Sequence, residues 1–430
     1  MSWPRPLVDG AVLVGGAVRD ALMDLSPRDL DWLVPDIEAA LGQLRRRPDS
    51  EPVQIDPSRL LYRVQIAGVW NDFAPIQGSL ADELRRRDFS VDALAWSPGS
   101  GLVDPVGGRA DLRRRRLRMV AEANLRADPL RLLRGARLIA THGLRAEPET
   151  EAALGRCAAD LASRQLAAPA PERVGAELDL LLCGGDPVSG LRALERWGAL
   201  AIWIPELAAT SGVWQGGFHH LDVYHHSLLA LAELVRLRPR APLDLRWATL
   251  LHDLGKPASR SQDAFGRYHF YGHAELGAAL ASSRLLELRR PRGLAERVSA
   301  LIAAHMLPLP GDLRLAKRFV HRRGELLPDL LDLMIADRQA ARGPLSNQGT
   351  RLAYQQGIDR VLQAMESPRP AAPLLDGHQI MAALGLPPGP LIGRLLAELA
   401  EAQAVGDLET SEQATEYLRR RLAALRAGQN

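Results

Sequence analysis

The sequence predicts an α+β protein in which a small α/β module precedes a long, almost purely helical chain. Three observations carry this prediction. Over the first ~120 residues, short apolar runs of strand length alternate with helical stretches. From Asp128 onward, apolar residues recur at helical spacing, as in Leu130, Leu133 and Ala136. The length of 430 residues gives room for about two to four domains.

The first module contains strands and helices in alternation. Val12–Val14 is a short apolar run that ends at Gly15-Gly16, and residues 60–67 alternate weakly, as a half-buried strand does. Helices are expected over residues 36–46 and 79–87, and further short strands at residues 102–103 and 117–120.

The helical part is divided by loop-like segments. Breaks are expected at residues 167–171, 211–220, 342–348 and 367–373, because these are rich in Gly, Pro, Ser or Ala-Pro. Helices are expected over residues 226–237 and 245–254, and a final helical unit over residues 376–427.

The composition excludes several classes of protein. Hydrophobic residues make up 47% and charged residues 24%, which is ordinary for a globular protein. The N-terminus lacks a signal-peptide pattern, and no apolar run approaches the ~20 residues of a membrane helix. Cys157 and Cys183 lack CxxC spacing and are expected to be buried thiols. We therefore expect a cytoplasmic protein without a membrane partner.

The basic residues are almost all arginine. Lys256 and Lys317 are the only lysines among 54 basic residues, yet the net charge is just +3. Coding bias alone can give this composition, but arginine also offers a planar fork of five donors suited to phosphate. The near-neutral balance argues against a protein that coats nucleic acid and permits local phosphate sites.

A carboxylate pair comes after a glycine turn. Gly15-Gly16 lets backbone amides approach a phosphate, and Arg19 could bind a phosphate oxygen. Asp29 and Asp31 share one side of an extended segment, where their repulsion calls for a cation, and oxygen ligands select Mg²⁺. Asp72 could add a third carboxylate from a neighbouring strand. An isolated Asp-X-Asp is more often a solvated strand edge, but the preceding glycine–arginine element favours a phosphate site.

Together with four motifs later in the chain, this segment resembles the bacterial class II tRNA nucleotidyltransferase and poly(A) polymerase family. The five motifs occur in the family's order: residues 14–22 with Asp29 and Asp31, residues 86–93, residues 104–112, residues 128–137 and residues 172–178. The resemblance implies a polymerase-β-like nucleotidyltransferase head followed by an all-helical body. It also implies transfer of CMP or AMP from CTP or ATP to the 3′ acceptor end of tRNA, with release of pyrophosphate.

The resemblance further assigns roles to residues. Asp29, Asp31 and Asp72 are the expected catalytic carboxylates, of which Asp29 and Asp31 hold Mg²⁺. The expected nucleotide-binding residues are Gly15, Gly16, Arg19, Arg86, Arg87, Asp128, Arg131, Arg134 and Arg137. Asp128 and Arg131 would read the base edge. Residues 128, 131 and 134 also share one helical face by their spacing.

Three departures from the family pattern bear on these roles. Asp92 stands where the second motif usually has Asn, and Ala127 precedes Asp128 where the family often has Glu. The segment from Asp72 to Arg86 is also short, whereas relatives that complete the whole CCA end usually carry a longer flexible loop there. The short segment favours a CC-adding enzyme, with full CCA addition, A addition and poly(A) polymerase-like activity as alternatives.

A second group of residues has the chemistry of a transition-metal site. His252-Asp253 comes at the end of an apolar helical run, with His226 one helix earlier and Asp337 later in the chain. Imidazoles with carboxylates suit Ni²⁺, Mn²⁺, Zn²⁺ or Fe²⁺. His273 and His305 could complete a second metal position. A lone helical His is more often a satisfied core residue, but here several histidines fall into one ordered pattern with two aspartates.

This pattern resembles the HD phosphohydrolase superfamily, which is helical and uses a metal to hydrolyse phosphoesters. The resemblance covers about residues 215–345, and Lys256 would contact phosphate there. We therefore expect a nucleotidyltransferase head over residues 1–122, a helical neck and body over 123–210, an HD domain over 211–345 and a helical tail over 346–430. A noncatalytic RNA- or nucleotide-binding protein is the alternative from another class.

Overall fold

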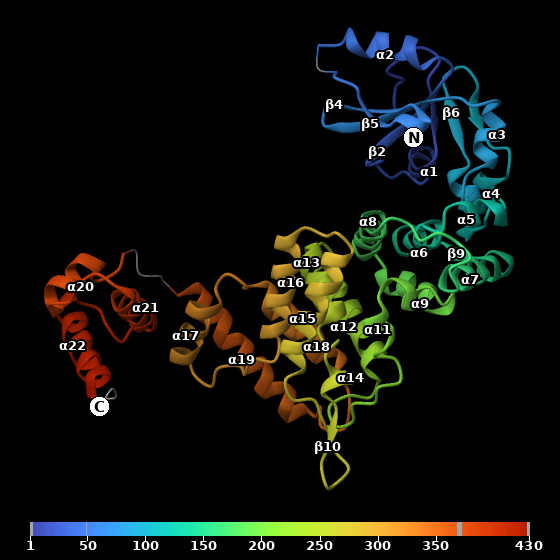
Figure 1. Ribbon diagram of the computed structural model, residues 1–430. Helices are drawn as coiled ribbons and strands as arrows, with labels where there is room; N and C mark the ends of the chain where they lie inside the picture. Colours follow the sequence, from blue (N-terminus) through green and yellow to red (C-terminus); the bar gives the residue numbers. More distant parts are fainter. Residues whose placement is uncertain (1–2, 49, 368–371, 428–430) are drawn as a thin grey trace. The chain divides into compact units, whose positions relative to one another are not determined.

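The computed structural model describes residues 3–48, 50–367 and 372–427, and Figure 1 shows its ribbon. The chain forms two compact units. The first unit comprises Met1–Ser211, Arg238–Trp247 and Ser282–Ala295, and the second comprises Gly212–Leu237, Ala248–Ala281 and Glu296–Asn430. Each unit carries one of the two groups of candidate residues, so each is described by itself.

The N-terminal part of the first unit is built on a seven-stranded sheet with the order β3-β4-β5-β2-β1-β6-β7. Its strands are β1 (Val12–Val14), β2 (Asp29–Val34), β3 (Val53–Asp56), β4 (Leu61–Ile66), β5 (Val69–Pro75), β6 (Ala95–Ser97) and β7 (Gly101–Val103). Only β2 and β5 pair in parallel, whereas the other neighbours are antiparallel. The parallel pair places the two aspartate-bearing strands side by side at the centre of the sheet.

Short helices connect the strands of this sheet. They are α1 (Gly16–Leu22), α2 (Ile37–Arg45), α3 (Leu80–Arg85) and α4 (Gly108–Arg113). Asp36 caps α2 by accepting hydrogen bonds from the amides of Glu38 and Ala39, and Ser79 caps α3 by accepting from Asp82. Buried Val14, Leu33, Leu84, Ala93 and Ala95 form a core against the sheet.

The rest of the first unit is mainly helical. It contains β8 (Arg116–Leu117), α5 (Glu122–Ala127), α6 (Arg131–His142), β9 (Arg145–Ala146), α7 (Pro148–Ala162), α8 (Pro171–Leu182), α9 (Pro187–Arg196), α10 (Leu200–Trp203) and α11 (Pro205–Ala208). Helix α6 packs against α8 and α9 through its buried leucines. Gly190 allows the close approach of α9, because a Cβ atom there would lie 2.8 Å from the carbonyl oxygen of Ala136.

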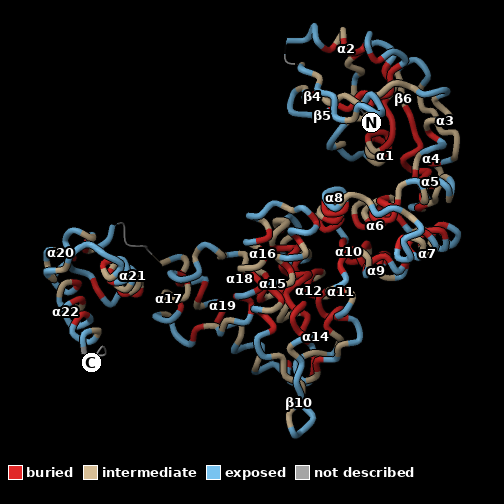
Figure 2. Tube along the Cα trace, viewed as in Figure 1, coloured by how far each residue is buried: buried red, intermediate tan, exposed pale blue. Residues whose placement is uncertain are grey.

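The second unit consists mainly of helices, and three of them, α13, α15 and α16, also contribute residues to the first unit. The helices are α12 (Val223–Leu237), α13 (Leu243–Leu251), α14 (Lys256–Ser259), α15 (His273–Glu287), α16 (Arg292–Ala304), α17 (Leu313–Arg323), α18 (Asp329–Ala340), α19 (Gln348–Glu366), α20 (Gly377–Leu384), α21 (Pro390–Val405) and α22 (Ser411–Ala427). Helices α12 and α18 pack against each other, and Figure 2 shows α12 as buried along much of its length.

The structure agrees with most expected elements and differs at identifiable points. The predicted all-helical second unit also contains a hairpin of β10 (Ser261–Gln262) and β11 (Tyr268–His269). The expected helix over 245–254 ends at Leu251, before the His-Asp pair. Cys157 is buried as expected, but Cys183 is exposed, because it comes after the last residue of α8. Part of the expected loop over residues 367–373 lies outside the described residues.

Among the described helices, none is long and apolar enough to cross a membrane.

Gly108→Ala is expected to destabilise the head by about 3 kcal/mol, because the new Cβ atom would lie 2.0 Å from the carbonyl oxygen of Ser90 and force the backbone apart. Gly42→Ala in α2 is the matched control. Nothing lies within 4 Å of a Cβ atom there, so this change should stabilise by about 0.5–1 kcal/mol. Hydrogen exchange of head peptides measures both; equal protection in the two variants would contradict the prediction.

Candidate functional site

The first group of candidate residues lies on the parallel strands β2 and β5. Asp31 is in register with Asp72, and Asp29 precedes Asp31 by two residues on the same side of β2. Burial raises the pKa of Asp31 to about 6, against the opposing positive charge of Arg87, and the negative charges of Asp29 and Asp72 add to the rise. The carboxylates are thus close enough to repel one another, which is the condition under which a bound cation is favourable.

Asp72 is held by an arginine that the sequence did not single out. Arg63 lies opposite Asp72 in the antiparallel register of β4 and β5. Its guanidinium donates two hydrogen bonds of 2.7 Å, one to each carboxylate oxygen. This bidentate pair fixes Asp72 beside Asp31 and neutralises its charge. Catalysis by Asp72 therefore stays a prediction, and Asp29 and Asp31 are the carboxylates whose oxygens are less engaged by protein partners.

The glycine turn adjoins the carboxylate pair. Gly15 adopts a φ of 74°, the left-handed region that glycine tolerates best, and its amide donates to the carbonyl of Leu94 at 2.9 Å. A Cβ atom at Gly15 would lie 2.3 Å from Nη1 of Arg87 and 3.6 Å from Oδ2 of Asp31. The absence of a side chain at Gly15 thus makes room for the Arg87 guanidinium next to Asp31. Of the two predicted arginines, Arg87 is the one that lies at the carboxylate pair.

Arg19 lies under the turn and is paired with protein carboxylates. Its guanidinium is buried and forms ion pairs with Asp20 at 2.8 Å and with Asp92 at 2.5 Å. Positive charges, of which Arg19 is the largest contributor, lower the pKa of Asp92 although burial opposes this shift. Asp92, which departs from the family pattern, therefore forms a structural ion pair with Arg19. Nucleotide contact by Arg19 stays a prediction.

Asp128 and Arg131 lie at the start of α6, where the base-reading pair is expected. Asp128 accepts a hydrogen bond of 2.8 Å from Arg173, a residue of the fifth motif. The guanidinium of Arg131 donates to the carbonyl oxygens of Asn124 at 2.9 Å and Arg86 at 3.2 Å. These hydrogen bonds orient both side chains. The two acceptors of Arg131 are neutral carbonyl groups, so these bonds leave its positive charge in place.

The next two arginines of α6 are paired with carboxylates. Arg134 lies 2.9 Å from Asp88, and Arg137 lies 2.7 Å from Glu177. Arg131 and Arg134 lie one turn apart on α6, but Asp128 is extended and precedes this helix, so the expected helical face does not include Asp128. Arg86, from the second motif, donates to the carbonyl of Gln77 at 3.0 Å and pairs with Glu83. The carboxylate partners of Arg134 and Arg137 were not predictable, because they lie 40 or more positions away in the sequence.

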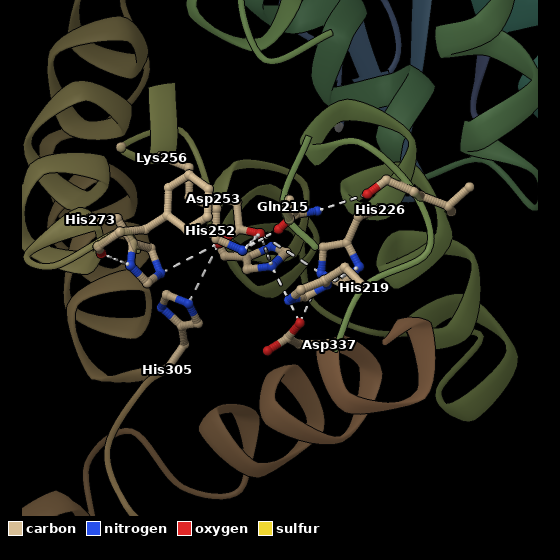
Figure 3. A network of polar contacts seen from close by, with 12 residues as sticks. Gln215, His219, His226, His252, Asp253, Lys256, His273, His305 and Asp337 are labelled. Carbon is tan, nitrogen blue, oxygen red and sulfur yellow. Dashed lines mark hydrogen bonds and ion pairs between the residues drawn. The ribbon is translucent and has the colours of Figure 1, made fainter. Parts of the chain in front are cut away.

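The second group is the histidine–aspartate cluster, which lies wholly in the second unit: His226, His252, Asp253, His273, His305 and Asp337 (Figure 3). Its side chains come from α12 and α18, from the ends of α13 and α16 and from the start of α15. The imidazole Nε2 of His226 lies 2.8 Å from Asp337, and that of His252 lies 3.2 Å from Asp253. The structure thus brings together the six residues that the sequence pattern predicts.

Backbone carbonyls orient three of the imidazoles. His252, His273 and His305 each have Nδ1 within 2.9 Å of a carbonyl oxygen, those of Thr249, Phe270 and Ile302. A carbonyl can only accept, so Nδ1 carries the proton and, in a neutral ring, Nε2 keeps its lone pair. Within the described part of the chain, these three Nε2 atoms and Oδ1 of Asp253 are buried without a hydrogen-bond partner.

These unpartnered atoms fit divalent metal ions. Two ligand sets have all their donor atoms within 4.8 Å of one another: His226, His252 and Asp337, and His252, Asp253 and His305. His273 approaches the second set, with Nε2 3.5 Å from Asp253. Burial lowers the pKa of His305 to about 4, which keeps this ring neutral and able to act as a ligand. The donor set and the carbonyl-oriented rings are those of a metal centre.

Lys256 and His219 lie at the edge of the cluster. The ammonium of Lys256 donates to Asp253 at 2.7 Å and to Gln215 at 2.5 Å, so its predicted phosphate contact stays a prediction. Nδ1 of His219 lies 3.4 Å from Nδ1 of His226, and burial lowers the pKa of His219 to about 3. His225 turns instead to Asp222 at 2.8 Å. Gln215 was not predicted, because a single Gln in a loop carries no pattern.

Three family models match parts of the chain. Residues 49–118 match a "Poly A polymerase head domain", residues 143–210 match a "Probable RNA and SrmB- binding site of polymerase A", and residues 223–342 match an "HD domain". The first contains the β5 carboxylate and the second motif, and the third contains the whole histidine–aspartate cluster.

Curated relatives cover nearly the whole chain. An A-adding tRNA nucleotidyltransferase of Deinococcus radiodurans is 49% identical over 96% of this chain and 96% of its own length. A CC-adding tRNA nucleotidyltransferase of Thermus thermophilus is 44% identical, over 97% and 95%. A multifunctional CCA protein of Alkalilimnicola ehrlichii is 33% identical, over 91% and 94%.

Solved structures share the fold at low sequence identity. The Bacillus stearothermophilus CCA-adding enzyme in complex with CTP has a TM-score of 0.63 and 20% identity, over 97% of this chain and 94% of that chain. The Thermotoga maritima CCA-adding enzyme complexed with tRNA has a TM-score of 0.61 and 20% identity, over 96% and 91%.

Asp31→Asn is expected to raise the melting temperature of the metal-free protein at pH 8. The pKa of Asp31 near 6 in the folded protein exceeds its usual 3.8, so ionisation of this carboxyl opposes folding, fully above about pH 6 and not at all below about pH 4. The amide has no such cost. The gain in melting temperature, measured by differential scanning fluorimetry with EDTA, should therefore shrink as the pH falls.

The exposed Asp24→Asn is the control and should change the melting temperature little at either pH. A gain for Asp31→Asn that is equal at pH 8 and pH 4 would mean that its charge is not the cause.

Proposed function

The chain belongs to the tRNA nucleotidyltransferase family, and from that premise we propose that it adds CMP to the 3′ end of tRNA and stops after the second C. In this reaction the 3′-hydroxyl of the tRNA attacks the α-phosphate of CTP, and pyrophosphate leaves. The observation that carries the proposal is the register of β2 with its two neighbours, which sets Asp31 opposite Asp72 of β5 and next to the Gly15 turn and Arg87.

The residues divide the work of this reaction. Asp29 and Asp31 would hold Mg²⁺, which neutralises the triphosphate and activates the attacking hydroxyl when it is bound. The Gly15 turn leaves room for the guanidinium of Arg87 beside Asp31, and this guanidinium would bind a phosphate of the triphosphate. Asp128 and Arg131, held by Arg173 and by backbone carbonyls, would present donors and acceptors to the edge of the incoming base.

The short connection between β5 and α3 supports the limit to CC. Only residues 76–79 join these elements. The amide of Ile76 donates to Val34 at 2.9 Å, that of Gln77 donates to Glu83 at 3.0 Å, and Ser79 caps α3. A connection tied at these points has no spare length with which to reshape the nucleotide pocket after two additions. The family resemblance implies that relatives that complete the CCA end usually carry a longer loop there.

A addition is the second candidate, and one observation favours it. The A-adding relative is 49% identical to this chain, which is more than the 44% of the CC-adding relative. Both of these relatives are named for part of the CCA sequence, whereas the multifunctional CCA protein is 33% identical. Both candidate functions therefore describe a specialist enzyme that adds only part of the CCA end.

For the second unit, we propose a metal-dependent phosphohydrolase that acts on phosphorylated RNA ends. The ligands are the histidine–aspartate cluster, and the chemistry of the donors suits Ni²⁺, Mn²⁺, Zn²⁺ or Fe²⁺. When bound, such an ion would supply the chemistry of making water a stronger nucleophile. Hydrolysis of a 2′,3′-cyclic phosphate adds water to phosphorus and breaks one ribose P–O bond, with a proton passing to the leaving oxygen. Lys256 would stabilise the phosphate charge.

We also propose that the four-part division into residues 1–122, 123–210, 211–345 and 346–430 describes the functional modules. The tRNA and nucleotide substrates further support a cytoplasmic site of action.

Product lengths on a sequencing gel will test the specificity. With tRNAs that end before CCA, after C and after CC, each given CTP or ATP, we expect CMP on the first two and none on the third. Efficient addition of AMP to the CC-ended tRNA, without addition of CMP, would establish the A-adding candidate instead. Extension of the unprocessed tRNA through all of CCA would show that the short connection does not limit addition.

Separate substitutions will test whether the two centres act independently. Asp31→Ala should abolish nucleotide addition, because it removes a carboxylate that binds Mg²⁺, and should leave hydrolysis of cytidine 2′,3′-cyclic monophosphate intact. His305→Ala should reduce the metal bound by the folded protein, measured by mass spectrometry, and should abolish hydrolysis alone. The exposed His378→Ala is the control and should change neither activity. Loss of both activities in either folded variant would contradict independence.

A further inference from the structure

A cavity lined by four arginines lies in the second unit, outside the histidine–aspartate cluster. It has a volume of about 370 Å³ and is formed by side chains of α12, α18 and α19. Its arginines are Arg236, Arg338, Arg342 and Arg351, and Glu233 is the carboxylate among the residues that line it. A volume of this order accommodates a nucleotide-sized ligand, and the excess of positive charge selects an anion.

The four arginines differ in their partners. Glu233 accepts hydrogen bonds from Arg236 at 2.8 Å and from Arg342 at 2.6 Å, so its single charge is shared. Arg338 donates to the hydroxyl of Thr350 at 2.8 Å, and Arg351 donates to the hydroxyl of Ser346 at 3.3 Å. Hydroxyl groups orient a guanidinium but leave its positive charge uncompensated. Arg338 and Arg351 thus keep their charge available for an anionic ligand.

Aromatic rings and backbone position Arg338 further. Its guanidinium carbon lies 5.5 Å from the ring centroid of Phe218 and 5.6 Å from that of Tyr354. The hydroxyl of Tyr354 donates to the carbonyl of Met334 at 2.9 Å and so fixes that ring on α18. The Nε of Arg338 is buried without a hydrogen-bond partner in the described part of the chain. The guanidinium is therefore held in place with bonding capacity left over.

The same pair of helices carries this cavity and the metal ligands. Arg338 comes directly after Asp337 on α18. On α12, Glu233 lies seven residues after His226, which is two helical turns and about 10 Å along the same face. Stacked nucleotides advance about 3.4 Å each along one strand, so about three nucleotides span this distance. A short RNA whose end lies at the cluster is therefore long enough to extend as far as the arginines.

We propose that this cavity, which we call the arginine pocket, binds backbone phosphates of single-stranded RNA whose end reacts at the histidine–aspartate cluster. The arginine pocket makes the hydrolase selective for polynucleotide ends over mononucleotides. The inference rests on the proposed hydrolase function of the second unit, and it adds the substrate class and the residues that select it.

Paired substrates test this selectivity in the full chain. One is a single-stranded RNA of about six nucleotides ending in a 2′,3′-cyclic phosphate, and the other is cytidine 2′,3′-cyclic monophosphate. In Arg338→Gln and Arg351→Gln, the ratio of kcat/KM for the RNA to that for the mononucleotide should fall about tenfold, because each variant loses a charge-assisted phosphate contact. The matched control is Arg360→Gln on the opposite side of α19, where Arg360 donates to the carbonyl of Pro310; this ratio should not change.

Salt dependence separates a phosphate contact from a structural role. For single strands, the slope of log affinity against log salt concentration should become shallower by about 0.7 for each contact removed. Fluorescence anisotropy of the labelled RNA at several salt concentrations measures this slope without turnover. If the parent protein hydrolyses neither substrate, the hydrolase proposal fails. The slopes of affinity against salt concentration would then still test whether the arginine pocket binds RNA. Equal losses on both substrates, or slopes that match the parent in both variants, would overturn the proposal.

Discussion

The repulsion between carboxylates on two parallel strands is the constraint on which the head of this enzyme depends. Asp29, Asp31 and Asp72 meet because β2 and β5 are in parallel register, and the pKa of Asp31 rises to about 6 as a result of burial and this crowding. The fold removes one of the three charges by pairing Asp72 with Arg63. What remains is a pair of carboxylates, which is the charge that a divalent cation compensates.

The histidine–aspartate cluster combines imidazoles with the carboxylates of Asp253 and Asp337. Carbonyl oxygens fix the Nδ1 protons of His252, His273 and His305, and their three Nε2 atoms are buried without a hydrogen-bond partner among the residues the structure describes. Each unpartnered polar atom costs free energy in the folded protein, and a bound metal ion recovers that cost. Both centres are therefore local sources of instability in the free chain, as is common where side chains are arranged for a ligand.

The sequence predicted the elements that depend on neighbours along the chain and, from motif order, the members of the histidine–aspartate cluster. The strand at Val12–Val14, the helix capped by Asp36 and the six members of the histidine–aspartate cluster could be predicted from short-range pattern and motif order. The partners of the arginines could not, because Arg19 meets Asp92 across 73 positions and Arg137 meets Glu177 across 40. Such pairs depend on strand register and helix packing, which local periodicity does not encode.

The partners of the arginines also bear on the excess of arginine in this chain. Arg19, Arg134 and Arg137 face carboxylates of the protein, and for such residues a role in holding the fold is sufficient. Arg131 is oriented by backbone carbonyls, and Arg338 and Arg351 are oriented by hydroxyl groups. Neutral acceptors fix the direction of a guanidinium without neutralising it, so its charge stays available to a phosphate or a base. Selection for RNA and nucleotide binding should therefore act on the arginines that are oriented by neutral acceptors. Coding bias suffices to explain the arginines that have neither a carboxylate partner nor such a neutral acceptor.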